Sequence, residues 1–335
     1  MGKFSATRSL LALGRLSHGT WNTYASSLQP FLRFLSEHGV PLQDVTDSTL
    51  EQYVCWVLEQ PKLRWTGGTL ASRISAVRTC WDELGMPLSS HHGPTKGALA
   101  GYRRLMESTL PVKLARQPWT ASNSHACLLA ALPLMVAFAG GTLPLADVKL
   151  VVAAAHVVLA SLTFSRGDTT NPMEMADLTV APDRFLVSLL KQKRPAARLP
   201  EQVHGVTAAP ADPSGFLVQF HGAQVQRGFT PTSLLFGIHP AAAAAFSLDA
   251  SVKLWQQRLA IPQSPTNPLT GHCVRVGAVS EAFAVGVPLL TCSFMCGHKS
   301  TSPTAGYVRH GHVPSAAAGT YYRHLLTGAD GRLSL

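Results

Sequence analysis

Apolar residues in the first hundred positions recur with the period of an α-helix. In residues 20–38 they fall on one helix face: Trp21, Tyr24, Leu28, Phe31, Leu32 and Leu35. Residues three and four apart lie together on a helix, so this stripe predicts an amphipathic helix. The same pattern predicts a second helix opened by Ser48 and Glu51 as a capping box, a third from Thr69, and a fourth over residues 96–107. We therefore expect a small helical domain here.

This pattern stops between Pro111 and Pro118, which places a domain boundary near residue 118. Beyond the boundary, residues 127–139 and 150–164 are almost wholly apolar. Each is shorter than the roughly 18 residues that a membrane span needs, so both are expected to be buried helices. No contact with a membrane is predicted.

A short β-hairpin is expected after these helices. Residues 185–190 have β character, and residues 199–203 could form the returning strand. Four basic residues lie between them: Lys191, Lys193, Arg194 and Arg198. Residues 205–250 are rich in Gly, Pro and Ala and give no readable pattern.

The charges favour a polyanionic partner. Of 335 residues, 28 are Lys or Arg and 18 are Asp or Glu, which gives a net charge of +10 at pH 7. Residues 62–116 hold nine basic residues and three acids. Because neutralised phosphates release counterions, such a surface binds nucleic acid without a sequence code, although a solvated helix face would have the same composition. The candidate DNA contacts are Arg64, Arg73, Arg78, Lys96, Arg103, Arg104 and Lys113.

Signatures of several other enzyme classes are missing. The chain has no Gly-rich nucleotide loop, no His-Glu-x-x-His helix and no Gly-x-Ser-x-Gly elbow. Its acids are scattered, which argues against a two-metal nuclease. Cys292, Cys296 and His298 could offer three zinc ligands, but a structural zinc site needs a fourth. We expect buried thiols here, and no metal or cofactor.

The last third of the chain carries an ordered series of short motifs. They are His272-Cys-Val-Arg275, Gly286-Val-Pro288, Gly297-His298-Lys-Ser300 and Tyr307-Val-Arg309. Their order and spacing resemble those of the tyrosine recombinases, also called phage-type integrases. Two further family positions have matches upstream, because Arg166 follows a buried apolar helix and Lys193 lies on the predicted hairpin. The resemblance spans roughly residues 18–325.

The resemblance implies a fold and an assembly. It implies a mainly α protein with a helical SAM-like core-binding domain (residues 20–117) and a catalytic domain (residues 118–335). Residues 1–19 contain Lys3, Arg8 and Arg15 and no acid, which predicts a basic, disordered N-terminal arm. The family's catalytic domain is an α-rich mixed α/β DNA breaking-rejoining fold with a small antiparallel sheet. Members act on double-stranded DNA as tetramers, which implies an intracellular location on DNA. Nucleus, nucleoid and organelle stay open.

The resemblance also assigns chemical roles. Arg166 and Arg275 would bind the non-bridging oxygens of the scissile phosphate, where negative charge grows in the transition state. His272 and His298 would add hydrogen bonds to these oxygens, and one of them could help to deprotonate the nucleophile. Tyr307 would attack phosphorus and form a 3′-phosphotyrosyl bond.

Some assignments leave alternatives. Lys193 would protonate the departing 5′ oxygen, but Lys191 on the same hairpin could take this role. Tyr321 and Tyr322 are rival candidates for the nucleophile, but they fit the spacing poorly. We expect them to be packing residues of a C-terminal helix. Thr169 stands where the family often has an acid. A type IB topoisomerase-like enzyme and a catalytically inactive DNA-binding remnant of a mobile element are the alternatives to a recombinase.

Overall fold

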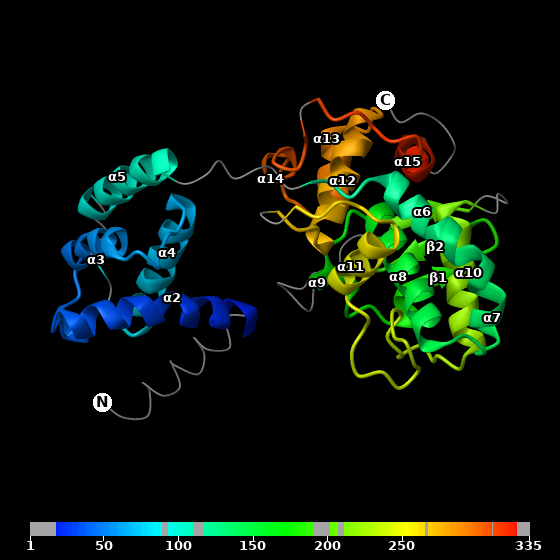
Figure 1. Ribbon diagram of the computed structural model, residues 1–335, viewed down its shortest axis with the longest axis horizontal. Coiled ribbons are helices and arrows are strands. Elements are labelled where there is room, and N and C mark those ends of the chain that lie inside the picture. Colours follow the sequence, from blue (N-terminus) through cyan, green and yellow to red (C-terminus); the bar gives the residue numbers. More distant parts are fainter. Residues whose placement is uncertain are drawn as a thin grey trace. The chain divides into compact units, whose positions relative to one another are not determined.

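The computed structural model divides into two compact units, residues 1–114 and 115–335 (Figure 1). Each unit has its own hydrophobic core. The described residues are 18–86, 88, 93–109, 117–189, 202–206, 211–264, 267–309 and 311–326. All but the last two residues of the predicted basic arm therefore lie outside the described residues.

The first unit is a bundle of helices. Its elements are α2 (His18–Glu37), the 3₁₀ turn η1 (Leu42–Asp44), α3 (Asp47–Glu59), α4 (Gly67–Glu83) and α5 (Gly93–Thr109). Its core is rich in aromatic rings. Phe31 of α2 meets Tyr53 of α3 and Trp81 of α4 edge to face, at centroid distances of 5.0 and 5.4 Å. Such pairs add specific geometry to the burial of large apolar surfaces.

Threonine side chains set where α3 and α4 begin. Thr46 Oγ1 accepts the Thr49 N–H at 3.3 Å, and Thr66 Oγ1 accepts the Thr69 N–H at 3.2 Å. The sequence-based starts at Ser48 and Thr69 are therefore wrong by two and three residues. The earlier threonines already satisfy N–H groups that have no partner inside the first helical turn.

Arg78 is held inside the first unit. Its guanidinium forms an ion pair with Asp47, and that carboxylate also accepts the Thr95 hydroxyl at 2.7 Å. The side chains of Arg78 and Asp47 are 17% and 9% exposed, and burial lowers the pKa of Arg78. Because these residues lie on α4, α3 and α5, the contact ties three helices together. The structure therefore gives Arg78 a stabilising contact within the bundle, where the sequence suggested a DNA contact.

The second unit is built around one buried helix. Its helices are α6 (Ala121–Ala131), η2 (Leu132–Leu134), α7 (Met135–Ala139), α8 (Leu145–Leu162), α9 (Gly167–Thr170), η3 (Met175–Asp177), α10 (Pro213–Gln226), α11 (Leu248–Arg258), α12 (Gly271–Ala284), α13 (Leu289–Met295), α14 (Ser302–Ala305) and α15 (Ala318–Leu326). The stretches Ala121–Ala139 and Leu145–Leu162 are long and apolar enough to cross a membrane by length and composition. Most of α8 is buried within the unit, where α6, α10, α11 and α12 pack against it.

A three-stranded antiparallel sheet completes this unit (Figure 1). Strands β1 (Leu178–Val180), β2 (Arg184–Val187) and β3 (Gln202–Gly205) pair in sequence order. The predicted hairpin corresponds to β2 and β3, whereas β1 gave too short a signal to be recognised. The protein is thus mostly helical with a small antiparallel sheet, which confirms the predicted fold class.

Candidate active site

The turn after α8 positions Arg166. Phe164 adopts the left-handed backbone region, with φ of 53°, although it is not glycine. This conformation is uncommon for a bulky residue and marks a constrained turn. The Phe164 carbonyl accepts a hydrogen bond from Arg275 Nε at 2.6 Å. This turn therefore positions Arg166, and its Phe164 carbonyl also anchors Arg275.

Helix α12 carries His272 and Arg275 in its first turns. Its start is fixed by Asp249, whose Oδ1 accepts the Gly271 N–H at 2.6 Å. Arg275 is only 5% exposed. Burial lowers its pKa, and the nearby Arg166 lowers it further, whereas Cys296, Tyr307 and a hydrogen bond with Tyr307 act in the opposite direction.

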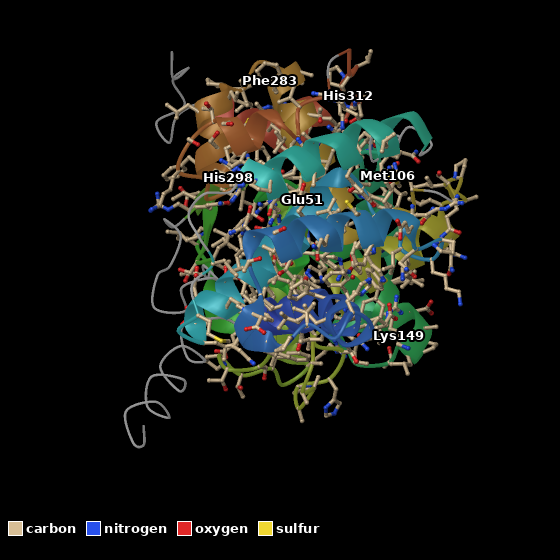
Figure 2. The ribbon with its side chains drawn as sticks, turned by 90° about the vertical axis from the view of Figure 1, so that its left-hand side faces the viewer. Glu51, Met106, Lys149, Phe283, His298 and His312 are labelled. Atoms are coloured by element: carbon tan, nitrogen blue, oxygen red, sulfur yellow. The ribbon has the colours of Figure 1, made fainter. Side chains whose placement is uncertain are left out.

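Tyr307 lies at the meeting point of the predicted residues. Its hydroxyl accepts a hydrogen bond from Arg166 Nη2, and its ring lies 5.4 Å from that of His272, centroid to centroid. The His298 ring stacks almost parallel to it, at 5.9 Å and 18° (His298 is labelled in Figure 2). Burial lowers the pKa of His298, and the charges of Arg275 and Arg166 lower it further. Both effects favour the neutral form of the His298 imidazole.

Two residues that the sequence did not single out form hydrogen bonds with the main chain of Tyr307. The Tyr307 N–H donates to the Thr304 carbonyl at 2.9 Å, and the Tyr307 carbonyl accepts the Ser280 hydroxyl at 2.8 Å. Thr304 Oγ1 also lies 2.7 Å from His298 Nδ1. No sequence motif marks either residue. The Ser280 contact joins segments 27 residues apart, and Thr304 lies between His298 and Tyr307 without a motif of its own.

Glu281, next to Ser280 on α12, fastens two other segments. Its carboxylate is fully buried and accepts the Ala121 N–H at 2.5 Å and the Ser315 N–H at 3.0 Å. His312 Nε2 lies 3.9 Å from the same group. The carboxylate thus links the start of α6 to the chain that follows Tyr307. A buried carboxylate is stable only with partners of this kind.

A cavity of about 480 Å³ opens beside this cluster. Its lining includes Arg166 and His272 together with Asp168, Asn171 and Asp249. The Arg166 guanidinium and the His272 imidazole therefore line a space that can hold part of a substrate.

Lys193 and Lys191 lie outside the described residues, as does Lys113. Five of the six predicted catalytic residues do converge: Arg166, His272, Arg275, His298 and Tyr307. Their catalytic roles stay predictions.

The remaining predicted DNA contacts divide into two kinds. Arg64, Lys96, Arg103 and Arg104 are exposed on the first unit. Arg73 is half-buried, with its guanidinium 4.2 Å from the centroid of Trp65 and bonded to the Ser26 carbonyl at 2.6 Å. The Arg73 side chain therefore makes contacts within the first unit, as the Arg78 side chain does.

The cysteines near the site are buried. Burial raises the pKa of Cys292 to about 12 and that of Cys296 to about 11, so both are thiols at pH 7. Within the described ranges, no group of three His, Cys, Asp or Glu residues is arranged to hold a metal ion. Tyr321 and Tyr322 are fully buried in α15, which fits the predicted packing role.

Comparison with known proteins bears on the fold. Residues 7–84 match the model of the phage integrase N-terminal SAM-like domain. A lambda integrase (75–356) dimer bound to a COC′ core site is 14% identical, covering 93% of this chain and 96% of that one, with a TM-score of 0.53. The fold is that of a tyrosine recombinase. The resemblance seen in the sequence is thereby confirmed.

Other solved structures share the tyrosine recombinase fold. The XerH site-specific recombinase on a palindromic difH substrate, in a post-cleavage complex, is 11% identical over 85% of this chain and 75% of that one, with a TM-score of 0.55. A lambda integrase tetramer bound to a Holliday junction is 12% identical over 92% and 77%, with a TM-score of 0.54. No curated protein sequence matches the chain.

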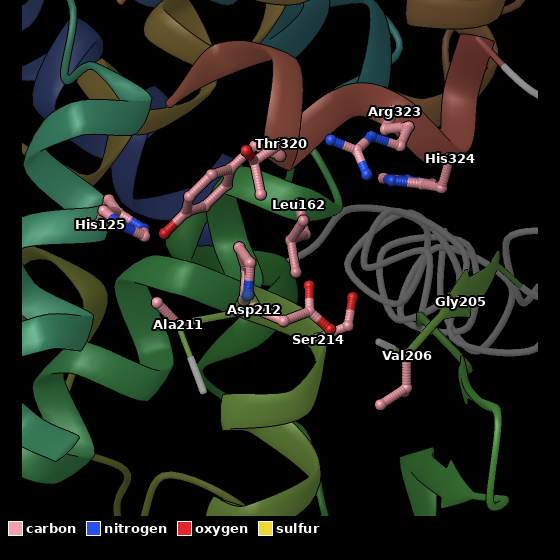
Figure 3. A pocket seen from close by; sticks show the side chains of 12 residues that line it. His125, Leu162, Gly205, Val206, Ala211, Asp212, Ser214, Thr320, Arg323 and His324 are labelled. Atoms are coloured by element: carbon pink, nitrogen blue, oxygen red, sulfur yellow. The ribbon is translucent and has the colours of Figure 1, made fainter. Parts of the chain in front are cut away.

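A second cavity, of about 460 Å³, lies next to α15 (Figure 3). His125 of α6, Asp212 before α10, and Arg323 and His324 of α15 line it. The His324 ring meets that of His204 at a centroid distance of 4.4 Å. Among the described residues, neither ring nitrogen of His204 has a hydrogen-bond partner. This pair is therefore poorly able to accept protons.

We expect acid to destabilise the second unit through these histidines. Burial lowers the pKa of His204 well below 6.5 and that of His324 to about 4. Between about pH 6.5 and pH 4 the unfolded chain therefore binds more protons than the folded one, so the free energy of unfolding falls as the pH falls. His204→Phe keeps the stacking on Phe185 and removes one titrating group. Thermal unfolding at pH 7.5, 6.5 and 5.5 should show a smaller acid-induced loss for this variant.

The exposed His239 offers the matched control. His239→Gln should leave the pH dependence unchanged. An equal acid-induced loss of melting temperature in His204→Phe and the wild type would contradict the prediction.

Proposed function

We propose that this chain is a site-specific DNA recombinase or integrase that cleaves and rejoins DNA through a 3′-phosphotyrosyl intermediate. The observation that supports this best is the hydrogen bond from Arg166 to the Tyr307 hydroxyl, with His272, Arg275 and His298 around the same ring. A nucleophile placed among fixed cations is what displacement at a phosphodiester requires.

In the proposed reaction the Tyr307 hydroxyl gives its proton to His272 or His298, its oxygen attacks phosphorus, and the bond from phosphorus to the 5′ oxygen breaks. Arg166 and Arg275 stabilise the charge that grows on the non-bridging oxygens, because each guanidinium presents a planar fork of donors. Lys193, or its neighbour Lys191, gives its proton to the departing 5′ oxygen. Rejoining reverses these steps, and the covalent bond conserves the energy of the broken one, so the reaction needs no ATP and no cofactor.

The first unit would contribute binding to double-stranded DNA. Its exposed basic residues Arg64, Lys96, Arg103 and Arg104 are the proposed phosphate contacts. Contacts of this kind position a protein on DNA without reading its sequence. Strand exchange joins two duplexes, so we propose a homotetramer on DNA, within whichever compartment holds the target DNA.

The decisive experiment looks for the covalent adduct. The full chain is incubated in EDTA with nicked duplexes tiled across the DNA that flanks its own gene. We expect a 3′-phosphotyrosyl adduct whose peptide map identifies Tyr307, and no adduct from Tyr307→Phe. Tyr321→Phe is the matched control, since the Tyr321 hydroxyl is buried without a hydrogen-bond partner in the described structure. It should form the adduct as the wild type does.

The outcomes separate the proposed function from its alternatives. An adduct that persists in Tyr307→Phe would overturn the assignment of the nucleophile. Relaxation of supercoiled DNA without any exchange between two duplexes would favour a type IB topoisomerase-like enzyme. Salt-sensitive DNA binding without an adduct on any duplex would favour a catalytically inactive remnant.

A further inference from the structure

His156 lies in the middle of α8 and is completely buried, yet the proposed reaction does not use it. Its ring stacks on that of Phe236, at a centroid distance of 3.9 Å and an interplanar angle of 4°. Its Nδ1 lies 2.9 Å from the Phe246 carbonyl oxygen, and its Nε2 lies 2.7 Å from Thr170 Oγ1. The ring therefore joins α8 to the end of α9 and to the loop before α11.

The tautomer of His156 follows from its two polar partners. A carbonyl oxygen only accepts hydrogen bonds, so Nδ1 carries the hydrogen that bonds Phe246. Burial lowers the pKa of His156 to about 3, although the hydrogen bond to Phe246 acts in the opposite direction. The ring is therefore neutral at pH 7, and Nε2 carries no hydrogen.

The Thr170 hydroxyl donates to this bare nitrogen. Thr170 Oγ1 has one hydrogen and two neighbouring acceptors, His156 Nε2 at 2.7 Å and the Arg166 carbonyl oxygen at 3.2 Å. A hydrogen directed at the carbonyl would leave the buried Nε2 facing an oxygen lone pair, and an unsatisfied buried acceptor is costly. The carbonyl is already satisfied, because it accepts the Thr169 N–H at 2.9 Å and the Thr170 N–H at 3.1 Å.

Thr170 and Arg166 lie at the two ends of α9. Thr170 is the last residue of this single turn, and Arg166 immediately precedes its first residue. Because the Thr170 N–H is bonded to the Arg166 carbonyl, a fixed Thr170 also fixes the peptide from which the Arg166 side chain extends. The guanidinium at the other end of that side chain bonds the Tyr307 hydroxyl.

We propose that His156 is a positioning residue for Arg166: its Nδ1–H tautomer, held by the Phe246 carbonyl, anchors the Thr170 hydroxyl and thereby the turn that presents Arg166 to the scissile phosphate. The effect on cleavage rests on the proposed function, whereas the anchoring does not. A displacement of about 1 Å in a catalytic group can cost about 100-fold in rate, so a contact this far from the chemistry affects it. The loop of residues 236–246 serves the same purpose, since it supplies both the stacking ring and the accepting carbonyl.

The first test needs no DNA. Long-range proton–nitrogen NMR spectra of the full chain report the tautomer of His156 and the Nε–H group of Arg166, and His156→Phe and Arg166→Ala assign these signals by their loss. We expect a protonated Nδ1 and a bare Nε2 that do not titrate between pH 7.5 and pH 6. Thr170→Val keeps the size of the side chain and removes the hydroxyl, so it should shift both the His156 Nε2 and the Arg166 signals. Thr170→Ser should leave them near their wild-type positions.

The second test measures single-turnover cleavage on the duplex that gives the adduct. Thr170→Val should slow cleavage by about 10–100-fold, with DNA affinity within a few-fold of wild type, and Thr170→Ser should restore most of the rate. Added to Arg166→Ala, Thr170→Val should have little further effect, because it acts through that arginine. Thr142→Val is the matched control, since Thr142 lies exposed before the opposite end of α8. Thr170→Ala replaces Thr170→Val should the valine variant fail to fold.

Several results would overturn this inference. A hydrogen on His156 Nε2 would show that the ring does not accept from Thr170. An unchanged Arg166 signal or a cleavage rate within a few-fold of wild type in Thr170→Val would show that the contact does not place Arg166. Equal losses with and without the Arg166 side chain would indicate a general structural role. If the wild type forms no adduct on any duplex, the proposed function fails, and the Arg166 signal still decides whether Thr170 holds the turn.

Discussion

Arg275→Lys should reduce the rate of adduct formation by about 10²–10³-fold, the effect of losing one preorganised donor from a site of developing charge. Arg275 is almost fully buried, and its Nε is bonded to the Phe164 carbonyl. Its remaining donors are therefore aimed before substrate arrives. Lysine keeps the charge but has no planar fork, so it cannot hold the carbonyl and the phosphate at once. Single-turnover cleavage of a nicked duplex measures the loss.

Arg258→Gln is the control for Arg275. Arg258 lies exposed in the last turn of α11. Its replacement should leave the cleavage rate near that of the wild type. DNA affinity is measured alongside, since Arg275→Lys should alter the rate far more than the affinity. A cleavage rate within a few-fold of wild type for Arg275→Lys would show that charge alone is sufficient.

Gly277→Ala should strongly destabilise the second unit. An added Cβ would lie 1.8 Å from the Trp119 carbonyl oxygen and 2.7 Å from its carbon. These are backbone atoms, and the Trp119 N–H is fixed to the Cys273 carbonyl at 3.0 Å, so the clash cannot be relieved by a rotamer change. Overpacking usually costs about 1–3 kcal/mol, and we expect the upper part of this range or more. Thermal unfolding should show a fall of several degrees, at about 2–4 °C per kcal/mol.

Gly222→Ala is the matched control in α10. No atom lies within 4 Å of its added Cβ, so alanine should stabilise the helix by about 0.5–1 kcal/mol. Equal melting temperatures for Gly277→Ala and the wild type would contradict this prediction. They would mean that the Trp119 backbone can move away from α12 without loss of stability.

The sequence predicted the helices of the first unit and the residues that converge on Tyr307. The first came from apolar periodicity, and the second from ordered motifs. It did not predict α10, although Asp212 before Pro213 is a typical helix start. Helix α10 buries Phe216, Leu217 and Phe220, but Val218 and Val225 lie on its less buried side, and these additional apolar residues obscure the periodic signal.

The supporting contacts could not be predicted for a different reason. Ser280 and Thr304 are small polar residues whose partners are main-chain atoms or a ring brought near by folding. Such partners leave no trace in local spacing. Arg78 shows a different limit, because its charge suggested a DNA contact while nothing in the sequence indicated its ion pair with Asp47.

The neighbouring residues Ser280 and Glu281 give the second unit a mechanical property. Ser280 holds the Tyr307 carbonyl, and Glu281 holds the Ser315 N–H. Both ends of the chain between Tyr307 and Ser315 are therefore fastened to one turn of α12. A force on α15 would act first on the hydrogen bond between Glu281 and Ser315, before it reached Tyr307. The position of the Tyr307 backbone is thus set independently of the bond that holds the chain before α15.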